Sequence, residues 1–208
     1  MHEDLLIIGA SGHGKVVADI ALHIGKYKNI AFLDDDASIH ECMGFPVIGK
    51  SSDFLQYIRD ADCFVAVGNA RARQRVMEEL FCAGAEIPVL VHPNATVGNR
   101  VMIGAGSVVM AGAVINSDSE IGQGCIVNTC ASVDHDCRIS AYTHVAVGAH
   151  VAGTVIIGEG CWIGAGAVVK NNVEICSNCT IGAGAVVIED IDSSGTYIGI
   201  PARRKDIN

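Results

Sequence analysis

A period of six residues governs the hydrophobic positions in the second half of the chain. Steps of six from Val91 to Val187 give seventeen positions, and all of them are Val or Ile without an insertion. Four residues after each position stands a small or β-branched residue, and glycines occupy offsets that suit turns. One β-branched and one small residue per six-residue unit is typical of a hexapeptide β-helix, which winds short strands into coils.

This repeat resembles that of the hexapeptide acyltransferase superfamily. In that superfamily the chain forms a left-handed parallel β-helix with three six-residue units in each coil. The resemblance therefore implies between five and six coils, with residues eighteen apart stacked about 4.8 Å from each other. Such a solenoid is stabilised because each coil buries its neighbour.

Cysteine occupies the small-residue position of the repeat four times, at Cys125, Cys137, Cys161 and Cys179. A free cysteine packs as a small apolar group in a tight interior. We therefore expect these four side chains to fill the inside of the coils. All nine cysteines are interpreted as reduced thiols rather than as a disulfide framework, catalytic nucleophiles or zinc ligands.

Residues 1–90 follow a different pattern, in which apolar strands alternate with helices. Strands are predicted over 5–8, 30–33, 63–67 and 88–91, and helices over 15–24, 52–59 and 71–83. This alternation is typical of an α/β module built on βαβ units. We therefore expect a Rossmann-like domain at 1–90, followed at 91–208 by a β-helix domain with a C-terminal capping tail.

A glycine-rich loop, GASGHGKV, follows the first predicted strand. It formally fits the ATPase pattern G-x-x-x-x-G-K, but Val16 stands where that loop needs a hydroxyl to hold magnesium. Glycines between a strand and its helix still let a phosphate approach the positive helix terminus. Asp34 and Asp35, at the end of the second strand, would meet a ribose or a base edge. A nucleotide at the strand ends is therefore expected, and a purely structural turn is the alternative.

Composition and charge exclude several classes of function. The chain is 50% hydrophobic and 18% charged, which indicates a packed globular protein. Its formal net charge of -9 provides no cationic field for a nucleic acid or an anionic membrane surface. Its apolar runs fall short of the ~18 residues that a membrane span requires, and Met1 opens no signal peptide. We expect a cytoplasmic protein with neither nucleic acid nor membrane as a partner.

Polar residues gather around one imidazole in segment 128–136, NTCASVDHD. His135 is the candidate general base, because an imidazole with a pKa near ~6.5 accepts a proton from an amine or hydroxyl at neutral pH. Asp136 or Asp134 would orient its ring. Eighteen residues after His135 stands Gly153, whose backbone N–H would polarise a thioester carbonyl as its oxyanion forms.

Other classes of function remain open at this stage. His135, His144 and His150 could hold zinc between subunits, as in the gamma carbonic anhydrases. His144 and His150 are six residues apart, so they would lie on successive faces and converge only across a subunit interface. A nucleotide-sugar sensor without catalysis would keep the glycine loop but would not need His135 beside an aspartate.

The chain as a whole resembles the sialic acid O-acetyltransferase and nucleotide-amino-sugar N-acetyltransferase family. The glycine loop, the LDD turn, the VGN strand end, the VHP junction, the repeat and NTCASVDHD occur in order. The bacillosamine-pathway UDP-4-amino-sugar N-acetyltransferases resemble it most. Members join a Rossmann-like nucleotide-sugar domain to a trimeric left-handed β-helix and bind acetyl-CoA between adjacent β-helices.

This resemblance implies a homotrimer with active sites between subunits, acetyl-CoA as co-substrate and no metal. The implied reaction is transfer of an acetyl group to the 4-amino group of a UDP-linked 4-amino-4,6-dideoxy sugar. Acetylation of a sialic acid hydroxyl is the alternative. We favour the amino sugar because a free sialic acid has no nucleotide and would leave the glycine loop without purpose.

The resemblance also implies a role for individual residues. His135 would be the base, Asp136 the group that raises its basicity, Asn128 a polar contact and Gly153 the oxyanion donor. Asp136 stands where related proteins carry glutamate. The coenzyme would lie against His144, Gly153, Ala165 and Ala183, and the nucleotide sugar against Ser11, Gly12, His13, Asp34, Asp35 and Gly68. The ending GIPARR resembles one whose cations meet the coenzyme phosphates or cap the last coil.

Overall fold

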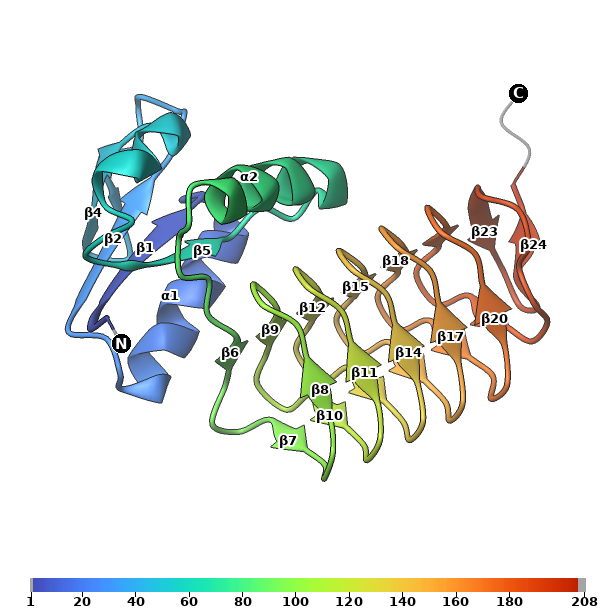
Figure 1. Ribbon diagram of the computed structural model, residues 1–208. Helices are drawn as coiled ribbons and strands as arrows, with labels where there is room; N and C mark the ends of the chain where they lie inside the picture. The colour runs from blue at the N-terminus through green and yellow to red at the C-terminus, as the bar shows by residue number, and fades with distance from the viewer. Residues whose placement is uncertain (1, 206–208) are drawn as a thin grey trace. The chain divides into compact units, whose positions relative to one another are not determined.

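The computed structural model describes residues 2–205 of the chain (Figure 1). Its contacts cluster into two compact units, Met1–Pro93 and Asn94–Asn208. The first unit ends at residue 93, whereas the sequence pattern predicted a boundary at residue 90. Among residues 2–205, no helix combines the length and the hydrophobicity that crossing a membrane demands.

The first unit is an α/β fold around a five-stranded sheet in the order β3-β4-β2-β1-β5. Its strands are β1 (Asp4–Ile8), β2 (Asn29–Leu33), β3 (Glu41–Cys42), β4 (Phe45–Gly49) and β5 (Asp62–Val65). Its other elements are helices α1 (Gly12–Ile24) and α2 (Ala70–Cys82), the 3-10 helix η1 (Ser51–Gln56) and the short strand β6 (Leu90–Val91). β1 pairs in parallel with β2 and β5. β1 lies between these two strands, and its residues are almost all apolar because a strand covered on both faces needs no polar side chains.

Two segments of this unit differ from the sequence prediction. Residues 52–59, predicted as an α-helix, contain instead the 3-10 helix η1. Asp53 accepts the Lys50 N–H with its side chain, and Tyr57 N–H bonds to Phe54 O, because serine and aspartate side chains compete with the α-helical pattern. Residues 41–49, for which no element was predicted, form β3 and β4 and extend the sheet beyond β2.

The strand order reverses between β1 and β5. β1 leads to β2 on one side, whereas β5 pairs with the other side of β1. Ligands of open α/β sheets bind outside the carboxyl ends of the strands at such a switch point. The loops after β1 and β5 adjoin there, since a Cβ added to Gly9 would lie 2.8 Å from the Ala66 carbonyl oxygen. Gly9 also has φ 107, so packing and backbone conformation both require glycine.

The second unit is a parallel β-helix with three faces, and its coils stack along one axis (Figure 1). The first face holds β7 (Thr96–Val97), β10 (Val114–Ile115), β13 (Ser132–Val133), β16 (His150–Val151), β19 (Val168–Val169) and β22 (Val186–Val187). The second face holds β8 (Met102–Ile103), β11 (Glu120–Ile121), β14 (Arg138–Ile139), β17 (Ile156–Ile157) and β20 (Glu174–Ile175). The third face holds β9 (Val108–Val109), β12 (Ile126–Val127), β15 (His144–Val145), β18 (Trp162–Ile163) and β21 (Thr180–Ile181), then β23 (Thr196–Ile198) and β24 (Arg203–Arg204).

The predicted period of six is confirmed by the strands themselves. Every two-residue strand from β6 to β22 ends on one of the predicted Val or Ile positions. Successive coils pair residues eighteen apart, as Ser132 with His150. The four repeat cysteines are at most 1% exposed, which confirms that they fill the interior.

Candidate active site

His135 lies in the turn after β13, at the corner between the first and second faces. Its ring Nδ1 is 2.7 Å from Asp136 Oδ2. Asp134 Oδ1 instead accepts the backbone N–H of His135 at 2.9 Å and the Asn116 Nδ2 at 2.7 Å. The sequence left both aspartates open as partners of the ring, and the structure gives that contact to Asp136.

These carboxylates raise the pKa of His135 above its ordinary value. The hydrogen bond to Asp136 is the largest cause and the charge of Asp134 the next, against a smaller opposing effect of desolvation. The pKa of Asp134 is lowered, chiefly because it accepts from Asn116 and then from the His135 backbone. With Nδ1–H donating to Asp136, the tautomer leaves Nε2 unprotonated and able to accept a proton.

Gly153 lies against the His135 ring, one coil further along. A Cβ added to Gly153 would be 2.6 Å from His135 Nε2, so only glycine leaves room for the ring in this position. The Gly153 carbonyl accepts the Asn172 N–H, whereas within residues 2–205 its own N–H donates no hydrogen bond. The count of eighteen residues therefore brings the candidate base and the candidate oxyanion donor together.

Asn128 and His144 form a second pair. His144 lies on the third face, and Asn128 follows β12 at the corner between the third and first faces. Asn128 Oδ1 accepts the Thr129 N–H at 2.8 Å, and Asn128 Nδ2 lies 2.9 Å from His144 Nε2. The first bond sets the orientation of the amide, so His144 Nε2 is the acceptor in the second. The His144 ring also packs on Trp162, with centroids 4.4 Å apart. Within one chain, Asn128 contacts this histidine rather than His135.

The two alanines expected beside the coenzyme follow β18 and β21 at the corner that also carries Asn128. Ala165 and Ala183 are both exposed. The Ala165 carbonyl accepts the Gly184 N–H at 2.9 Å, so successive coils lie close together here. A surface of backbone and methyl groups results, which a long flexible ligand can approach closely.

The positive N-terminal end of α1 receives no side-chain cap from Ser11 and no acidic residue in its first turn. A Cβ added to Gly12 or to Gly68 would meet nothing within 4 Å, and neither residue has a positive φ. Packing and conformation therefore do not require glycine at these positions, and the open space lies where an anion is stabilised by the helix terminus.

The two aspartates after β2 have different surroundings. Asp34 accepts the Ala10 N–H at 2.7 Å with Oδ2 and the Asp36 N–H at 2.9 Å with Oδ1. Asp35 is exposed and accepts the Ser51 N–H at 3.0 Å with Oδ1. Asp34 thus braces the loop after β1, which the sequence did not predict, and Asp35 is the carboxylate that a ligand reaches more easily.

The sequence analysis missed the burial of Arg73 and the contact between Cys176 and Cys179. Arg73 is 1% exposed, although an arginine on a helix is usually placed at the surface. Cys176 and Cys179 bring their Sγ atoms to 3.5 Å, and their C-x-x-C spacing was the available signal. Desolvation, with the hydrogen bond to Cys176 as the next cause, raises the pKa of Cys179 to about 12, so it is a protonated interior thiol at neutral pH.

The three histidines of the zinc alternative lie apart in the β-helix. His135 occupies a corner, His144 the third face and His150 the first face. Across the described residues 2–205, no three histidine, cysteine, aspartate or glutamate side chains converge as metal ligands. A zinc site built on these histidines would require ligands from a second chain.

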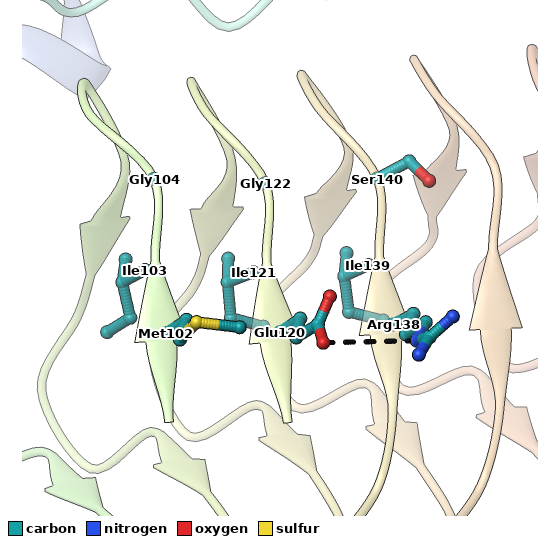
Figure 2. Close-up of a pocket in the computed structure, with 9 residues that line it drawn as sticks. All are labelled: Met102, Ile103, Gly104, Glu120, Ile121, Gly122, Arg138, Ile139 and Ser140. Atoms are coloured by element: carbon teal, nitrogen blue, oxygen red, sulfur yellow. Dashed lines mark ion pairs between the residues drawn. The ribbon is translucent and has the colours of Figure 1, made fainter. Parts of the chain in front are cut away.

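A hollow of about 400 Å³ lies on the second face (Figure 2). Figure 2 shows Met102, Glu120 and Arg138 in a row on β8, β11 and β14. The Arg138 Nε lies 4.0 Å from Glu120 Oε1, so the two charges of this row offset each other. None of the candidate site residues lines the hollow, and we assign it no part in the chemistry.

Two family models match the chain. The PglD N-terminal domain matches residues 4–80. The bacterial transferase hexapeptide model, which describes six repeats, matches residues 154–189. The two matches fall in the two units of the structure.

Characterised relatives extend this assignment over almost the whole chain. The acetyltransferase domain of PglB from Neisseria gonorrhoeae FA1090, solved with acetyl coenzyme A, is 44% identical, has a TM-score of 0.95 and covers 99% of this chain and 100% of its own. PerB from Caulobacter crescentus, solved with CoA and GDP-perosamine, is 37% identical, has a TM-score of 0.92 and covers 98% of this chain and 97% of its own.

A third relative is the UDP-N-acetylbacillosamine N-acetyltransferase of Bacillus subtilis (strain 168), which is 35% identical over 112 residues. This match covers 52% of each protein, so the chain spans about half the length of that relative. The two solved structures cover both units of this chain. Their sequence identities of 44% and 37% support a comparison of family as well as of fold. The chain belongs to the family of acetyl-CoA-dependent sugar N-acetyltransferases that join a PglD N-terminal domain to a left-handed hexapeptide β-helix.

Proposed function

We propose that this chain transfers an acetyl group from acetyl-CoA to the 4-amino group of a UDP-linked 4-amino-4,6-dideoxy sugar. The observation that carries the proposal is the His135–Asp136 pair, with Gly153 directly against the ring. A base with raised basicity beside a backbone N–H suits attack of an amine on a thioester. Membership of the acetyltransferase family supports the same reaction.

In the proposed mechanism, the unprotonated His135 Nε2 accepts a proton from the substrate nitrogen as that nitrogen attacks the thioester carbon. A C–N bond forms, and the carbonyl oxygen becomes an oxyanion that accepts from the Gly153 N–H. Collapse of this intermediate breaks the C–S bond. The CoA sulfur leaves as a thiolate and recovers the proton from His135, so the base is regenerated without a metal.

The same reasoning supports a homotrimer. His135 and Gly153 lie at one edge of the first face, whereas Asn128, Ala165 and Ala183 lie at its opposite edge. A coenzyme that meets both groups would have to bridge two chains. We therefore place acetyl-CoA between adjacent subunits, with the first faces directed inward. Sedimentation equilibrium should give a mass of three chains.

The nucleotide site is proposed at the switch point of the first unit. The diphosphate would lie at the N-terminus of α1, near Ser11, Gly12 and His13, and the base near Asp35. Gly68 would line the other side. UDP is our choice of nucleotide and GDP is the second candidate, because PerB was solved with GDP-perosamine.

Mass spectrometry of separate reactions tests the function as a whole. Each reaction contains acetyl-CoA and one acceptor: a 4-amino-4,6-dideoxy sugar linked to UDP, TDP or GDP, or free sialic acid. Acetylation of the UDP sugar alone is expected. Acetylation of the GDP sugar alone would replace UDP by GDP, and acetylation of sialic acid alone would refute N-acetylation. Activity lost with a chelator and restored by zinc would refute the metal-free mechanism.

Asp35→Ala should raise the KM for the nucleotide sugar about tenfold with little change in kcat. The physical reason is that an exposed carboxylate binding the nucleotide acts equally in the ground and transition states. Steady-state rates at varied nucleotide sugar and saturating acetyl-CoA measure both constants. The exposed Asp60 of the same unit provides the control variant Asp60→Ala. An unchanged KM for Asp35→Ala would remove Asp35 from the site.

Asp136→Asn should move the acidic limb of the kcat/KM profile to lower pH. Asp136 raises the pKa of His135, and the base works only above that pKa, so loss of the carboxylate extends the neutral form to lower pH. The weaker base should also lower kcat about tenfold at pH 8. Rates between pH 5.5 and 9 measure both effects, with the exposed Glu159→Gln as the control. A limb at the same pH in both variants would contradict the pairing of Asp136 with the catalytic ring.

A further inference from the structure

Asn116 joins the turn that carries His135 to the preceding coil. It follows β10, eighteen residues before Asp134, and its Nδ2 donates to Asp134 Oδ1 at 2.7 Å. The same oxygen accepts the His135 N–H at 2.9 Å. An ionised carboxylate can only accept, so the amide of Asn116 presents its nitrogen here. One oxygen of Asp134 is therefore held by two donors, and Asn116 is the donor from another coil.

This hydrogen bond is not part of a ladder along the β-helix. At the same step of eighteen, the residues next to the pair are Gly98 on one side and Ala152 on the other, and neither has a polar side chain that extends it. The coils are joined here by the backbone in any case, since the Asn116 N–H donates to the Val133 carbonyl at 2.9 Å. The contact between Asn116 and Asp134 is therefore local to the coil of the candidate base.

The position of Asp134 matters because two carboxylates flank one imidazole. The His135 side chain is 58% exposed, so packing does little to hold the ring. Its Nδ1 lies 2.7 Å from Asp136 Oδ2, which leaves Nε2 unprotonated. A second carboxylate at the ring would favour a proton on Nε2 as well, and the imidazole would then lose the free nitrogen that the proposed reaction uses.

The same contact fixes the backbone from which the ring projects. The His135 N–H donates to Asp134 Oδ1, and the His135 carbonyl accepts the Thr154 N–H at 2.9 Å. Without Asn116, the first of these bonds would rest on a contact between sequence neighbours, which leaves the carboxylate of Asp134 free to rotate. Displacement of a catalytic group by about 1 Å can cost about 100-fold in rate.

The other charges near His135 form pairs of opposite sign. Asp118, in the preceding coil, accepts two hydrogen bonds of 2.6 and 2.7 Å from the Arg100 guanidinium. On the second face, which follows this turn, the Arg138 Nε lies 4.0 Å from Glu120 Oε1. The glycine that the next coil places against the ring carries no charge. The two aspartates beside His135 in the sequence are therefore the charges that set its protonation.

We propose that Asn116 is a positioning residue of the active site, which holds Asp134 on the backbone N–H of His135 and thereby leaves the ring to Asp136 alone. The inference rests on the proposed function, because it takes His135 to be the base. Asn116 itself touches neither the ring nor, in this proposal, a substrate. Its effect passes through Asp134, so it should change the protonation of His135 without weakening the binding of either substrate.

An NMR titration of the ligand-free protein tests this role without any catalytic step. With isotope-labelled histidines, the His135 signal is identified by its loss in His135→Ala, and its pH midpoint is compared between the wild type and Asn116→Ala. The released carboxylate of Asp134 should approach the ring, and a nearer negative charge favours the imidazolium. The midpoint of His135 should therefore move to higher pH in Asn116→Ala.

The pH profile of the reaction should show the same change. The base works only above its pKa, so kcat/KM of Asn116→Ala should fall about fivefold at pH 6 and by less than about twofold at pH 8.5. This shift is opposite in direction to the one expected of Asp136→Asn. KM for both substrates at pH 8.5 should stay within about twofold of the wild type, because a positioning residue of the base binds neither of them.

Gln123→Ala is the matched control for Asn116→Ala. It removes another exposed side-chain amide that bridges two coils, since Gln123 Nε2 donates to the Tyr142 hydroxyl at 2.9 Å. The midpoint of His135 and the pH profile should be those of the wild type. Asn116→Ser, whose hydroxyl is too short to reach Asp134, takes the place of Asn116→Ala if that variant does not fold.

A double variant shows whether Asn116 acts through the carboxylate. In an Asp134→Ala protein, Asn116→Ala should move the midpoint of His135 no further, because residues that act as a unit are not additive. A shift of the same size with and without Asp134, or an equal shift in Gln123→Ala, would indicate a general loosening of the coils and would refute the proposed role.

The outcomes separate this inference from the proposed function. If the wild type acetylates none of the acceptors, the proposed function fails, while the titration still reports whether Asn116 controls the ring. If the wild type is an acetyltransferase and the midpoint of His135 in Asn116→Ala is unchanged or lower, the role of Asn116 is refuted and the proposed function stands.

Discussion

Replacing His135 with alanine should lower kcat by about 100-fold or more, with little change in the KM of either substrate. His135 Nε2 is the only nitrogen in our mechanism that takes the proton from the attacking amine, and water in the vacated space is a weaker and poorly placed base. The residual rate would come from the orientation of the bound substrates and from the Gly153 N–H. Release of CoA at saturating substrates measures kcat directly.

The stability of the fold should not change with this substitution. The His135 side chain is 58% exposed, so its removal leaves no cavity. His23→Ala, on α1, is the matched control, because it removes another exposed imidazole, one that belongs to the first unit. A His135→Ala enzyme within threefold of the wild-type kcat would eliminate His135 as the base.

Gly153→Ala should lower kcat by between about 10-fold and 100-fold while the thermal midpoint stays within a few degrees. The new Cβ would lie 2.6 Å from His135 Nε2, so the ring must leave the position in which Asp136 holds it. Gly153 has no positive φ, and alanine therefore fits the backbone without strain. Alanine also retains the N–H, so the proposed oxyanion donor remains. Steady-state rates and a thermal melt of the same preparation measure the two quantities.

A double variant separates displacement of the ring from other causes. If Gly153→Ala acts only by moving His135, it should lower kcat no further in a His135→Ala enzyme, because residues that act as a unit are not additive. A further tenfold loss in the double variant would show instead that position 153 acts on the substrate independently of the ring.

The regularity of the repeat explains why contacts between coils could be predicted from residue numbers alone. With no insertion between Val91 and Val187, a fixed step of eighteen residues correctly stacks Gly153 on His135 and buries the repeat cysteines. The first unit lacks such a rule. Its βαβ alternation predicts the central strands, but β3, β4 and the 3-10 form of η1 depend on local side-chain hydrogen bonds and on pairing with β2.

Side-chain contacts within the site were decided by the tertiary structure. Asp134 and Asp136 flank His135 symmetrically in the sequence, and only the turn geometry, in which Asp136 has φ 58, directs one carboxylate to the ring and the other to the backbone. Asp34 became a brace because the folded loop brings the Ala10 N–H to it. Arg73 gave no signal, since an arginine on an amphipathic helix is normally solvated.

The sequence by itself determined the two architectures, the six-residue period and the stacking of His135 on Gly153, because backbone periodicity places residues in columns regardless of their neighbours. The tertiary structure alone decided which carboxylate holds the base, that Asn128 pairs with His144, and that Arg73 is buried with hydrogen bonds to Val67 and Gly68. The rotamers and burial of these side chains depend on how loops and successive coils pack, so the contacts exist only in the folded chain.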